Sequence, residues 1–263
     1  MDTIQLSIEE LIFSFYSEGL YEQGMSLKET YFPNLKDDEL RFMLEMAARS
    51  LLAKNMVEEA HHQYKIKDEV KPYIHALNDA NRTIKASKFL GNLEDEQSIT
   101  FHTTDQNLFM HQLLHDHQIH QVGKISKEKA RFMIYDFFQF DSLKRECEES
   151  FTMKNEEYEK LLEAVSQDET QCSLEQVDTN LKGNPLFEAF LDDLSVRKGK
   201  MDSILYIEYD QENLPNIVDL LFIVPGKKET WFISRGNYNE FVFQKANEKT
   251  VQTFLFERNS MTV

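Results

Sequence analysis

Cysteine, glycine and tryptophan are all scarce in this chain of 263 residues, which contains 2, 8 and 1 of them respectively. The two cysteines, Cys147 and Cys172, provide neither a CxxC pair for metal binding nor a disulfide framework, and they fit reduced thiols in a cytosolic protein. Eight glycines leave little material for phosphate-binding loops, and the nucleophile motif G-x-S-x-G is absent. We therefore predict no catalytic residues, no cofactor, no metal and no enzymatic activity.

Basic side chains are also in short supply, with 29 Lys and Arg against 46 Asp and Glu and a formal net charge of −17. Such a negative field repels the phosphates of nucleic acids and the headgroups of anionic lipids, so neither is an expected partner. No apolar run approaches the length of a membrane-spanning helix, and no basic region followed by an apolar stretch suggests a signal peptide. We expect a soluble cytoplasmic protein.

The last quarter of the chain is rich in β-branched and aromatic residues that are arranged in short runs. Turn-forming pairs such as Pro225-Gly226 separate the runs, and short connections make neighbouring strands antiparallel. One face of such a sheet has to be covered by helices. The pattern therefore predicts a β-meander with strands at Ser203–Tyr209, Ile217–Val224, Thr230–Ser234 and Glu240–Glu257, the last with a break near Ala246.

A second meander is predicted in the first half of the chain, where the hydrophobic period changes from helical spacing to shorter β-runs. Its strands are expected at Thr83–Leu90, Ser98–Thr103, Asn107–Leu114 and Gln118–Ile125.

Helices are predicted around both meanders. The capping-box pattern Ser7-Ile-Glu-Glu10 begins the first helix, which ends near Gly19, whereas the segment Tyr21–Lys36 is expected to be irregular. Further helices are expected after Asp37, over Asp68–Asn78, from Ser126 to Phe140, within the acidic segment Arg145–Asp178 and from Pro185 onwards.

The order helices, meander, helix, then helices, meander indicates an α+β fold in which antiparallel β-meanders are covered by helices. We predict a pseudo-two-fold arrangement of two similar halves, residues 1–144 and 145–263. No linker rich in Pro, Gly or Ser separates them, which favours one composite domain.

Five of the eight histidines lie between His102 and His120. On a hairpin that turns at Asp116-His117, His111 and His115 share one face, and His120 joins them across the turn. Three histidines could hold a zinc ion, but no H-E-x-x-H or equivalent motif supports it. A polar hairpin face is the simpler interpretation, and a His-centred metalloenzyme stays an alternative.

The first hundred residues have the helix and strand order of a winged helix. In the third helix and the wing, however, basic side chains exceed acidic ones by only two, which is little against the overall negative charge. The basic residues are Lys67, Lys71, Arg82, Lys85 and Lys88, and the acidic ones are Asp68, Glu69 and Asp79. A winged-helix regulator with a C-terminal sensor half is a second alternative.

The C-terminal meander carries more aromatic residues than one buried sheet face needs. We predict partner binding at Phe222, Trp231, Tyr238 and Phe241, if some of these side chains are exposed. If helices cover both faces of the sheet, the same residues belong to the core instead.

Three segments together resemble the EspG-type chaperones of type VII secretion. They are Ser7-Ile-Glu-Glu-Leu11 at the start of a helix, the helix end Ala47–Met56, and Ala76–Ala80 leading into strands from Arg82. The resemblance covers about residues 7–258. It implies a pseudo-two-fold α+β fold and a cytosolic chaperone that keeps helical secretion substrates in solution. The known members bind PE–PPE pairs, whereas this chain, rich in Lys, Asn and Phe, would serve helical hairpins of the WxG type or the helical prefix of a toxin.

Overall fold

The computed structural model describes residues 3–60, 63–105, 107–140, 143, 149–167, 181–237 and 239–258. The chain divides into two compact units, each assembled from separate parts of the sequence. Unit 1 comprises Met1–Thr83, Ile99–Ser126 and Tyr209–Leu214, and unit 2 comprises Ile84–Ser98, Lys127–Glu208 and Pro215–Val263. Within the described residues, every helix is too short or too polar to cross a membrane.

Unit 1 is built on four antiparallel strands in the order β1-β7-β6-β5. Their bounds are Thr3–Ser7 (β1), Glu96–Thr103 (β5), Leu108–Leu114 (β6) and Ile119–Ile125 (β7). Cross-strand partners share a face of the sheet, so Thr100, His111, Val122 and Ile4, which pair in that order, all point the same way.

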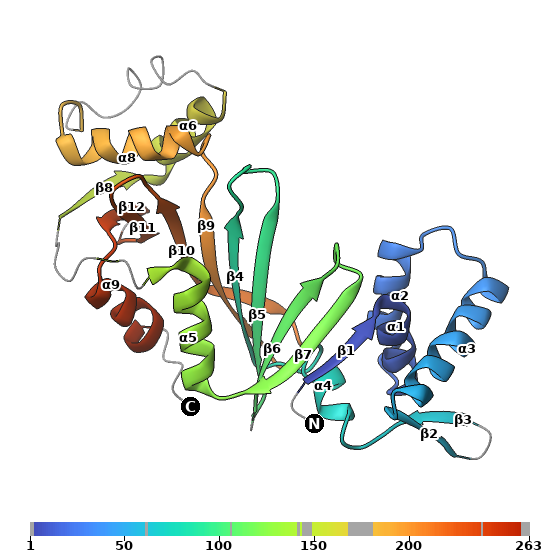
Figure 1. Ribbon diagram of the computed structural model, residues 1–263. Coiled ribbons are helices and arrows are strands. Elements are labelled where there is room, and N and C mark those ends of the chain that lie inside the picture. Colours follow the sequence, from blue (N-terminus) through green and yellow to red (C-terminus); the bar gives the residue numbers. More distant parts are fainter. Residues whose placement is uncertain are drawn as a thin grey trace. The chain divides into compact units, whose positions relative to one another are not determined.

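The helices of unit 1 come from the first 75 residues (Figure 1). They are α1 (Ile8–Ser17), α2 (Tyr21–Tyr31), α3 (Asp37–Ala53) and α4 (Lys71–His75), and a separate hairpin is formed by β2 (Val57–Ala60) and β3 (Gln63–Ile66). Helix α1 packs against both α2 and α3. The apolar core joins Ile4 and Leu6 of β1 to Leu11 and Phe15 of α1.

Unit 2 contains the strand order β4-β9-β10-β11-β12-β8. The bounds are Arg82–Phe89 (β4), Ser150–Lys154 (β8), Asp202–Tyr209 (β9), Pro215–Pro225 (β10), Thr230–Arg235 (β11) and Glu240–Lys245 (β12). Its helical segments are α5 (Lys127–Phe138), α6 (Asn155–Ser166), α8 (Pro185–Val196), α9 (Glu248–Gln252) and the π-helical turn η2 (Thr253–Arg258).

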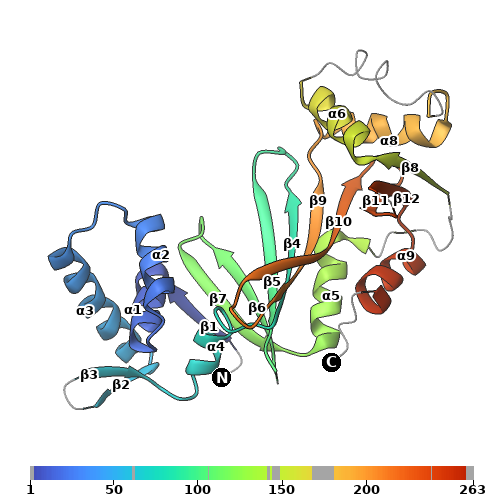
Figure 2. The same ribbon diagram turned by 180° about the vertical axis from the view of Figure 1, so that it is seen from behind.

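Helices cover both faces of the sheet in unit 2. On one face α6 and α8 pack against Trp231, Ile233 and Phe243 in an aromatic core that is almost fully buried. On the other face Phe232 meets Phe140, which follows α5, edge to face at 5.5 Å between ring centroids. The two views show α6 and α8 on one side of β8, β11 and β12, and α9 on the other (Figures 1 and 2). The fold is thus the expected α+β class, with antiparallel strands flanked by helices.

The two halves of the chain repeat one order of elements. In each half a five-residue strand, β1 or β8, runs directly into a helix, α1 or α6. A four-stranded meander follows, β4 to β7 or β9 to β12, and a helix, α5 or α9, comes after it. The first strand of each half pairs with the last strand of its own meander, β1 with β7 and β8 with β12. The two compact units do not coincide with these halves, since β4 and α5 group with unit 2. A domain boundary at residue 144 therefore stays a prediction.

Three predicted segments differ from the structure. Residues Tyr21–Tyr31 form α2 instead of an irregular connection, and Gly24 in its middle packs against the ring of Tyr16. The C-terminal strand ends at Lys245, because Asn247 and Thr250 form a capping box that begins α9. The helix expected over Asp68–Asn78 is confined to Lys71–His75, with Pro72 in its first turn.

The predicted capping box of α1 is confirmed, and its glutamate does more than cap. Ser7 Oγ accepts a hydrogen bond from Glu10 N, and Glu10 Oε2 accepts one from Ser7 N at 2.8 Å. The Glu10 carboxylate is 3% exposed and also accepts hydrogen bonds from Ser50 Oγ and Lys54 Nζ of the α3 region, both at 2.7 Å. One buried side chain therefore holds the start of α1 against the end of α3.

We expect Glu10→Ala to lower the free energy of unfolding by about 2–4 kcal/mol, because Ser50, Lys54 and the Ser7 amide all lose their acceptor. Urea unfolding followed by circular dichroism measures the change. Glu9→Ala is the matched control: it removes a carboxylate from the same first turn and is expected to change stability by less than about 0.5 kcal/mol. Equal effects of the two substitutions would show that the α1–α3 contact is not the cause.

Candidate functional site

Three histidines lie side by side on the helix-covered face of unit 1, one on each of three neighbouring strands. His102 is on β5, His111 on β6 and His120 on β7. Their ring centroids are 5.8 Å apart between His102 and His111 and 5.2 Å apart between His111 and His120, whose planes are within 13° of parallel. We call these three residues the histidine row.

Hydrogen bonds hold the histidine row in place but leave some of its nitrogens without a partner. His111 Nε2 lies 3.0 Å from His120 Nδ1, and His102 Nδ1 lies 3.0 Å from Thr83 Oγ1. The Nε2 atoms of His102 and His120 are buried and have no hydrogen-bond partner among the described residues. The rings of His102 and His120 therefore each have one nitrogen whose hydrogen-bonding capacity is unused.

Burial keeps the row uncharged. Desolvation lowers the pKa of His102 and of His120 from 6.5 to about 4. For His111 desolvation, together with the repulsion that protonated His102 and His120 would exert, lowers the pKa to about 3. All three imidazoles are neutral at pH 7, and each ring carries one N–H donor and one acceptor nitrogen.

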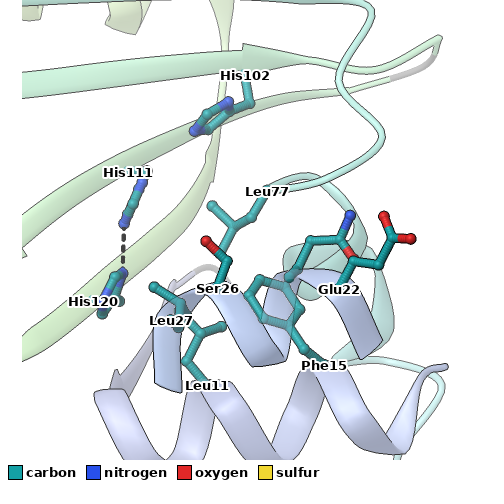
Figure 3. A pocket seen from close by; sticks show the side chains of 10 residues that line it. Leu11, Phe15, Glu22, Ser26, Leu27, Leu77, His102, His111 and His120 are labelled. Atoms are coloured by element: carbon teal, nitrogen blue, oxygen red, sulfur yellow. Dashed lines mark hydrogen bonds between the residues drawn. The ribbon is translucent and has the colours of Figure 1, made fainter. Parts of the chain in front are cut away.

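A pocket of about 490 Å³ opens beside the histidine row (Figure 3). The three imidazoles form its sheet side. Its opposite side is apolar and consists of Leu11 and Phe15 of α1, Leu27 of α2, and Leu77, whereas the exposed side chains of Glu22 and Ser26 belong to its outer part. The size is within the range of small-molecule sites, and an apolar wall that faces a few fixed polar atoms is their usual composition.

The structure corrects the histidine set that the hairpin pattern predicted. His111 and His120 meet as expected, but His115 lies in the exposed turn with a φ of 52° and does not join them. His102 of the preceding strand takes the third place instead. In the part of the chain that the structure describes, no group of three or more His, Cys, Asp or Glu residues is arranged to hold a metal ion.

The aromatic residues predicted to bind a partner have different surroundings. Trp231 is fully buried, and its indole Nε1 donates to Asp193 Oδ2 at 2.9 Å, so exposure as a partner-binding residue does not fit its position. Phe222 and Phe241 are half-buried against the aromatic core of unit 2, 6.4 Å apart. Tyr238 lies outside the described residues, as do Cys147 and Cys172. Partner binding at Phe222 and Phe241 stays a prediction.

Asp193 of α8 organises the turn between β10 and β11. Its Oδ1 accepts a hydrogen bond from Lys227 N at 3.1 Å, while Oδ2 accepts the one from Trp231. The Asp193 carboxylate thus occupies the Lys227 amide, which is therefore already satisfied within the protein. The sequence signal was its place on α8, one helical turn after the buried Phe190.

Two of the basic side chains on which a winged helix would depend are engaged within the protein. Lys71 pairs with Asp68 at 2.8 Å, and Lys88 donates to the Phe137 carbonyl oxygen at 2.7 Å while its ammonium lies over the Phe137 ring. Two fewer cations are thus available for phosphate contacts, and no feature of the described residues favours DNA binding over the other interpretations.

The fold is similar to a solved chaperone structure. It superposes with a TM-score of 0.63 on the Mycobacterium tuberculosis type VII secretion system chaperone EspG5, solved in complex with a PE25–PPE41 dimer. The similarity covers 95% of this chain and 93% of that chain at 10% sequence identity. At that identity it is a similarity of fold, which agrees with the fold implied by the EspG-type resemblance.

Sequence comparison identifies the family. The chain is 38% identical over 258 residues to the "Uncharacterized protein YfjC" of Bacillus subtilis (strain 168), covering 97% of this chain and 99% of that protein. Residues 3–255 match the sequence model of the family described as "Uncharacterised protein YfjC". Both matches span nearly the whole chain, and the chain therefore belongs to the YfjC family.

Proposed function

We propose that the chain is a cytoplasmic chaperone or adaptor that binds a helical substrate of type VII secretion and keeps it in solution for export, without enzymatic activity. The observation that supports this most strongly is the fold, which is similar over 95% of the chain to EspG5, solved with a PE25–PPE41 dimer. Because the sequence identity is 10%, the proposal extends to the class of partner and not to the particular proteins.

The proposed mechanism is burial of apolar surface. A helical substrate that waits in the cytoplasm exposes an apolar end, and covering it contributes roughly 25 cal/mol per Å² removed from water. We propose that the accessible edges of Phe222 on β10 and Phe241 on β12 take part in this contact. The net charge of −17 keeps the complex from associating further.

Co-expression tests the function. The full chain is produced together with each small helical protein encoded next to it, and complexes are separated by size-exclusion chromatography. We expect one of these proteins to be insoluble when it is produced alone, and to co-elute with the chain at a fixed ratio when both are present. If none of them forms such a complex, the proposed function is wrong.

Charge substitutions then test the site separately from the function. Phe222→Glu and Phe241→Glu are expected to weaken the complex at least about tenfold, because a carboxylate would be buried in an apolar contact. Phe132→Glu is the matched control, since Phe132 of α5 is 69% exposed in the same unit. A complex that survives the first two substitutions in folded protein would leave the function standing and remove these residues from the site.

A further inference from the structure

The histidine row has no role in the chaperone function proposed above, although it has the features of a binding site. Buried polar atoms in folded proteins are nearly always hydrogen-bonded. Here His102 and His120, which are 9% and 6% exposed, each present a buried Nε2 without a partner among the described residues. Both rings line the same pocket, which makes a ligand with a matching polar group the natural partner.

The hydrogen bonds along the histidine row indicate which polar group a ligand would need. The His111–His120 and His102–Thr83 contacts are each compatible with either direction of donation. The Nε2 atom of His102 and that of His120 are each accordingly a donor in one tautomer and an acceptor in the other. An indole N–H can only donate and a carbonyl oxygen can only accept, whereas a hydroxyl group does both. A hydroxyl therefore satisfies the row in every tautomer.

The other walls of the pocket indicate what the rest of the ligand is like. Leu11, Phe15, Leu27 and Leu77 offer an apolar surface, and the Phe15 ring and the imidazole rings provide flat partners for an aromatic ring. The exposed Glu22 in the outer part of the pocket and the strongly negative chain disfavour an anion.

We propose that this pocket binds an uncharged aromatic alcohol of the phenol class, with its ring against Leu11, Phe15 and Leu27 and its hydroxyl bonded to Nε2 of His102 or of His120. The lowered pKa values of the row support this, because a neutral imidazole accepts a hydrogen bond and a protonated one does not. The volume of about 490 Å³ leaves room for substituents on the ring.

Helix α2 is the wall of the pocket that has the least buried surface. This helix forms one wall through Leu27, and Gly24 is its only buried residue. No side-chain hydrogen bond caps its first turn. A wall that is held by so little buried surface can shift outwards to admit a ring without disturbing the core of α1 and the sheet.

Three matched probes test the proposal on the full chain at pH 7.5, by following the imidazole signals of histidine-labelled protein in NMR titrations. We expect p-cresol to bind with a dissociation constant on the order of 1 mM, about tenfold more tightly than toluene, which lacks the hydroxyl. The anion 4-methylbenzoate is expected not to bind. The signals of His102 and His120 should shift, and those of His115 and His117 in the exposed turn should not.

Two variants and one control link binding to the pocket. The double substitution His102→Phe with His120→Phe keeps two aromatic rings but removes both candidate Nε2 atoms, and it should abolish the preference for p-cresol over toluene. Leu27→Trp fills the pocket from the accessible helix α2 and should block both probes. His115→Asn, which suits the positive φ of that turn position, should bind p-cresol like the unchanged protein. Thermal unfolding of each variant verifies that it is folded.

The probes also distinguish a free ligand from a side chain of a partner protein. N-acetyltyrosinamide carries the same phenol on a peptide backbone. Binding of both p-cresol and this compound supports a site that also takes a tyrosine side chain, whereas binding of p-cresol alone supports a site for free phenols. If p-cresol fails to bind at 10 mM, a concentration well above the expected dissociation constant of about 1 mM, or if toluene binds equally well, the proposal is wrong.

Discussion

Lowering the pH from 7 to 5 is expected to reduce the free energy of unfolding by several kcal/mol. The cause is the histidine row. His102, His111 and His120 have folded-state pKa values of about 4, 3 and 4, whereas an unfolded histidine titrates near pH 6.5. At pH 5 the unfolded chain has protonated these residues and the folded chain has not.

The direction follows from proton linkage. Between the folded and unfolded pKa values the unfolded state binds more protons, so stability rises with pH across that window. The contribution is fully present above pH 6.5 and is lost progressively as the pH falls towards 4. By pH 5 each imidazole has cost the folded state on the order of 2 kcal/mol of stability relative to pH 7, and because the three interact, these losses do not simply add.

Urea unfolding at a series of pH values measures this effect, and His111→Gln identifies its source. The variant has one fewer titrating group in the row, and its stability is expected to fall less steeply between pH 7 and pH 5. An equally steep fall would place the cause outside the row.

His75 supplies a control of the opposite sign. Burial by itself would lower its pKa, but its hydrogen bonds to Asp79 and Glu18, at 2.8 and 3.1 Å, raise the pKa overall. Its contribution is fully present below pH 6.5 and is lost as the pH rises through the raised folded-state pKa. His75→Gln is therefore expected to make the fall in stability between pH 7 and pH 5 steeper.

Replacing Gly226 with alanine is expected to destabilise the protein by about 3 kcal/mol or more. A Cβ atom at this position would lie 2.1 Å from Asp193 Oδ2 and 2.6 Å from the Glu229 carbonyl oxygen. Neither atom can move freely. Asp193 is held by the Trp231 indole and the Lys227 amide, and the Glu229 oxygen accepts the hydrogen bond from Gly226 N that closes the turn.

The cost has two parts, because relieving the clash displaces the Asp193 carboxylate. The indole N–H of the fully buried Trp231 then loses its acceptor, which adds about 1–3 kcal/mol to the steric strain. Gly91→Ala is the matched control: Gly91 also lies in unit 2, and a Cβ there meets no atom within 4 Å. Thermal unfolding should separate the two variants by roughly 5–10 °C. Equal melting temperatures would mean that the β10–β11 turn adapts without cost.

Both meanders could be predicted from the sequence because their strands alternate or cluster apolar residues between recognisable turns. The predicted strand Ser98–Thr103 corresponds to β5, and Ile217–Val224 lies within β10. The capping box at Ser7 and the proline at the start of α8 also predicted helix starts correctly, because both signals depend only on neighbouring residues.

Elements that depend on distant partners could not be predicted in this way. The strands β1 and β8 have only five residues each, too few for a clear pattern, and they are strands because β7 and β12 pair with them. The segment after Lys245 shows the opposite error: its apolar residues suggested a continued strand, whereas the local cap at Asn247 determined a helix.

The site was predicted in part. The hairpin pattern correctly brought His111 and His120 together. It failed at His115 because residues 115–117 all have positive φ, from 52° to 63°, so the alternation of a strand stops at Leu114. His102 could have been found by extending the same facing pattern to the preceding strand. The pocket could not, because it depends on how α1 and α2 pack against the sheet.

The pairing of β1 with β7 has a consequence for synthesis on the ribosome. Strand β1 is translated well before β7, and its partner is complete only when Ile125 has been translated. Until then Ile4 and Leu6 lack their pairing strand. A nascent chain released before this point would carry an unpaired, apolar first strand that is prone to aggregate. Only after β7 has been translated can β1 pair with its native partner, and this pairing removes the exposed strand edge that favours misassembly.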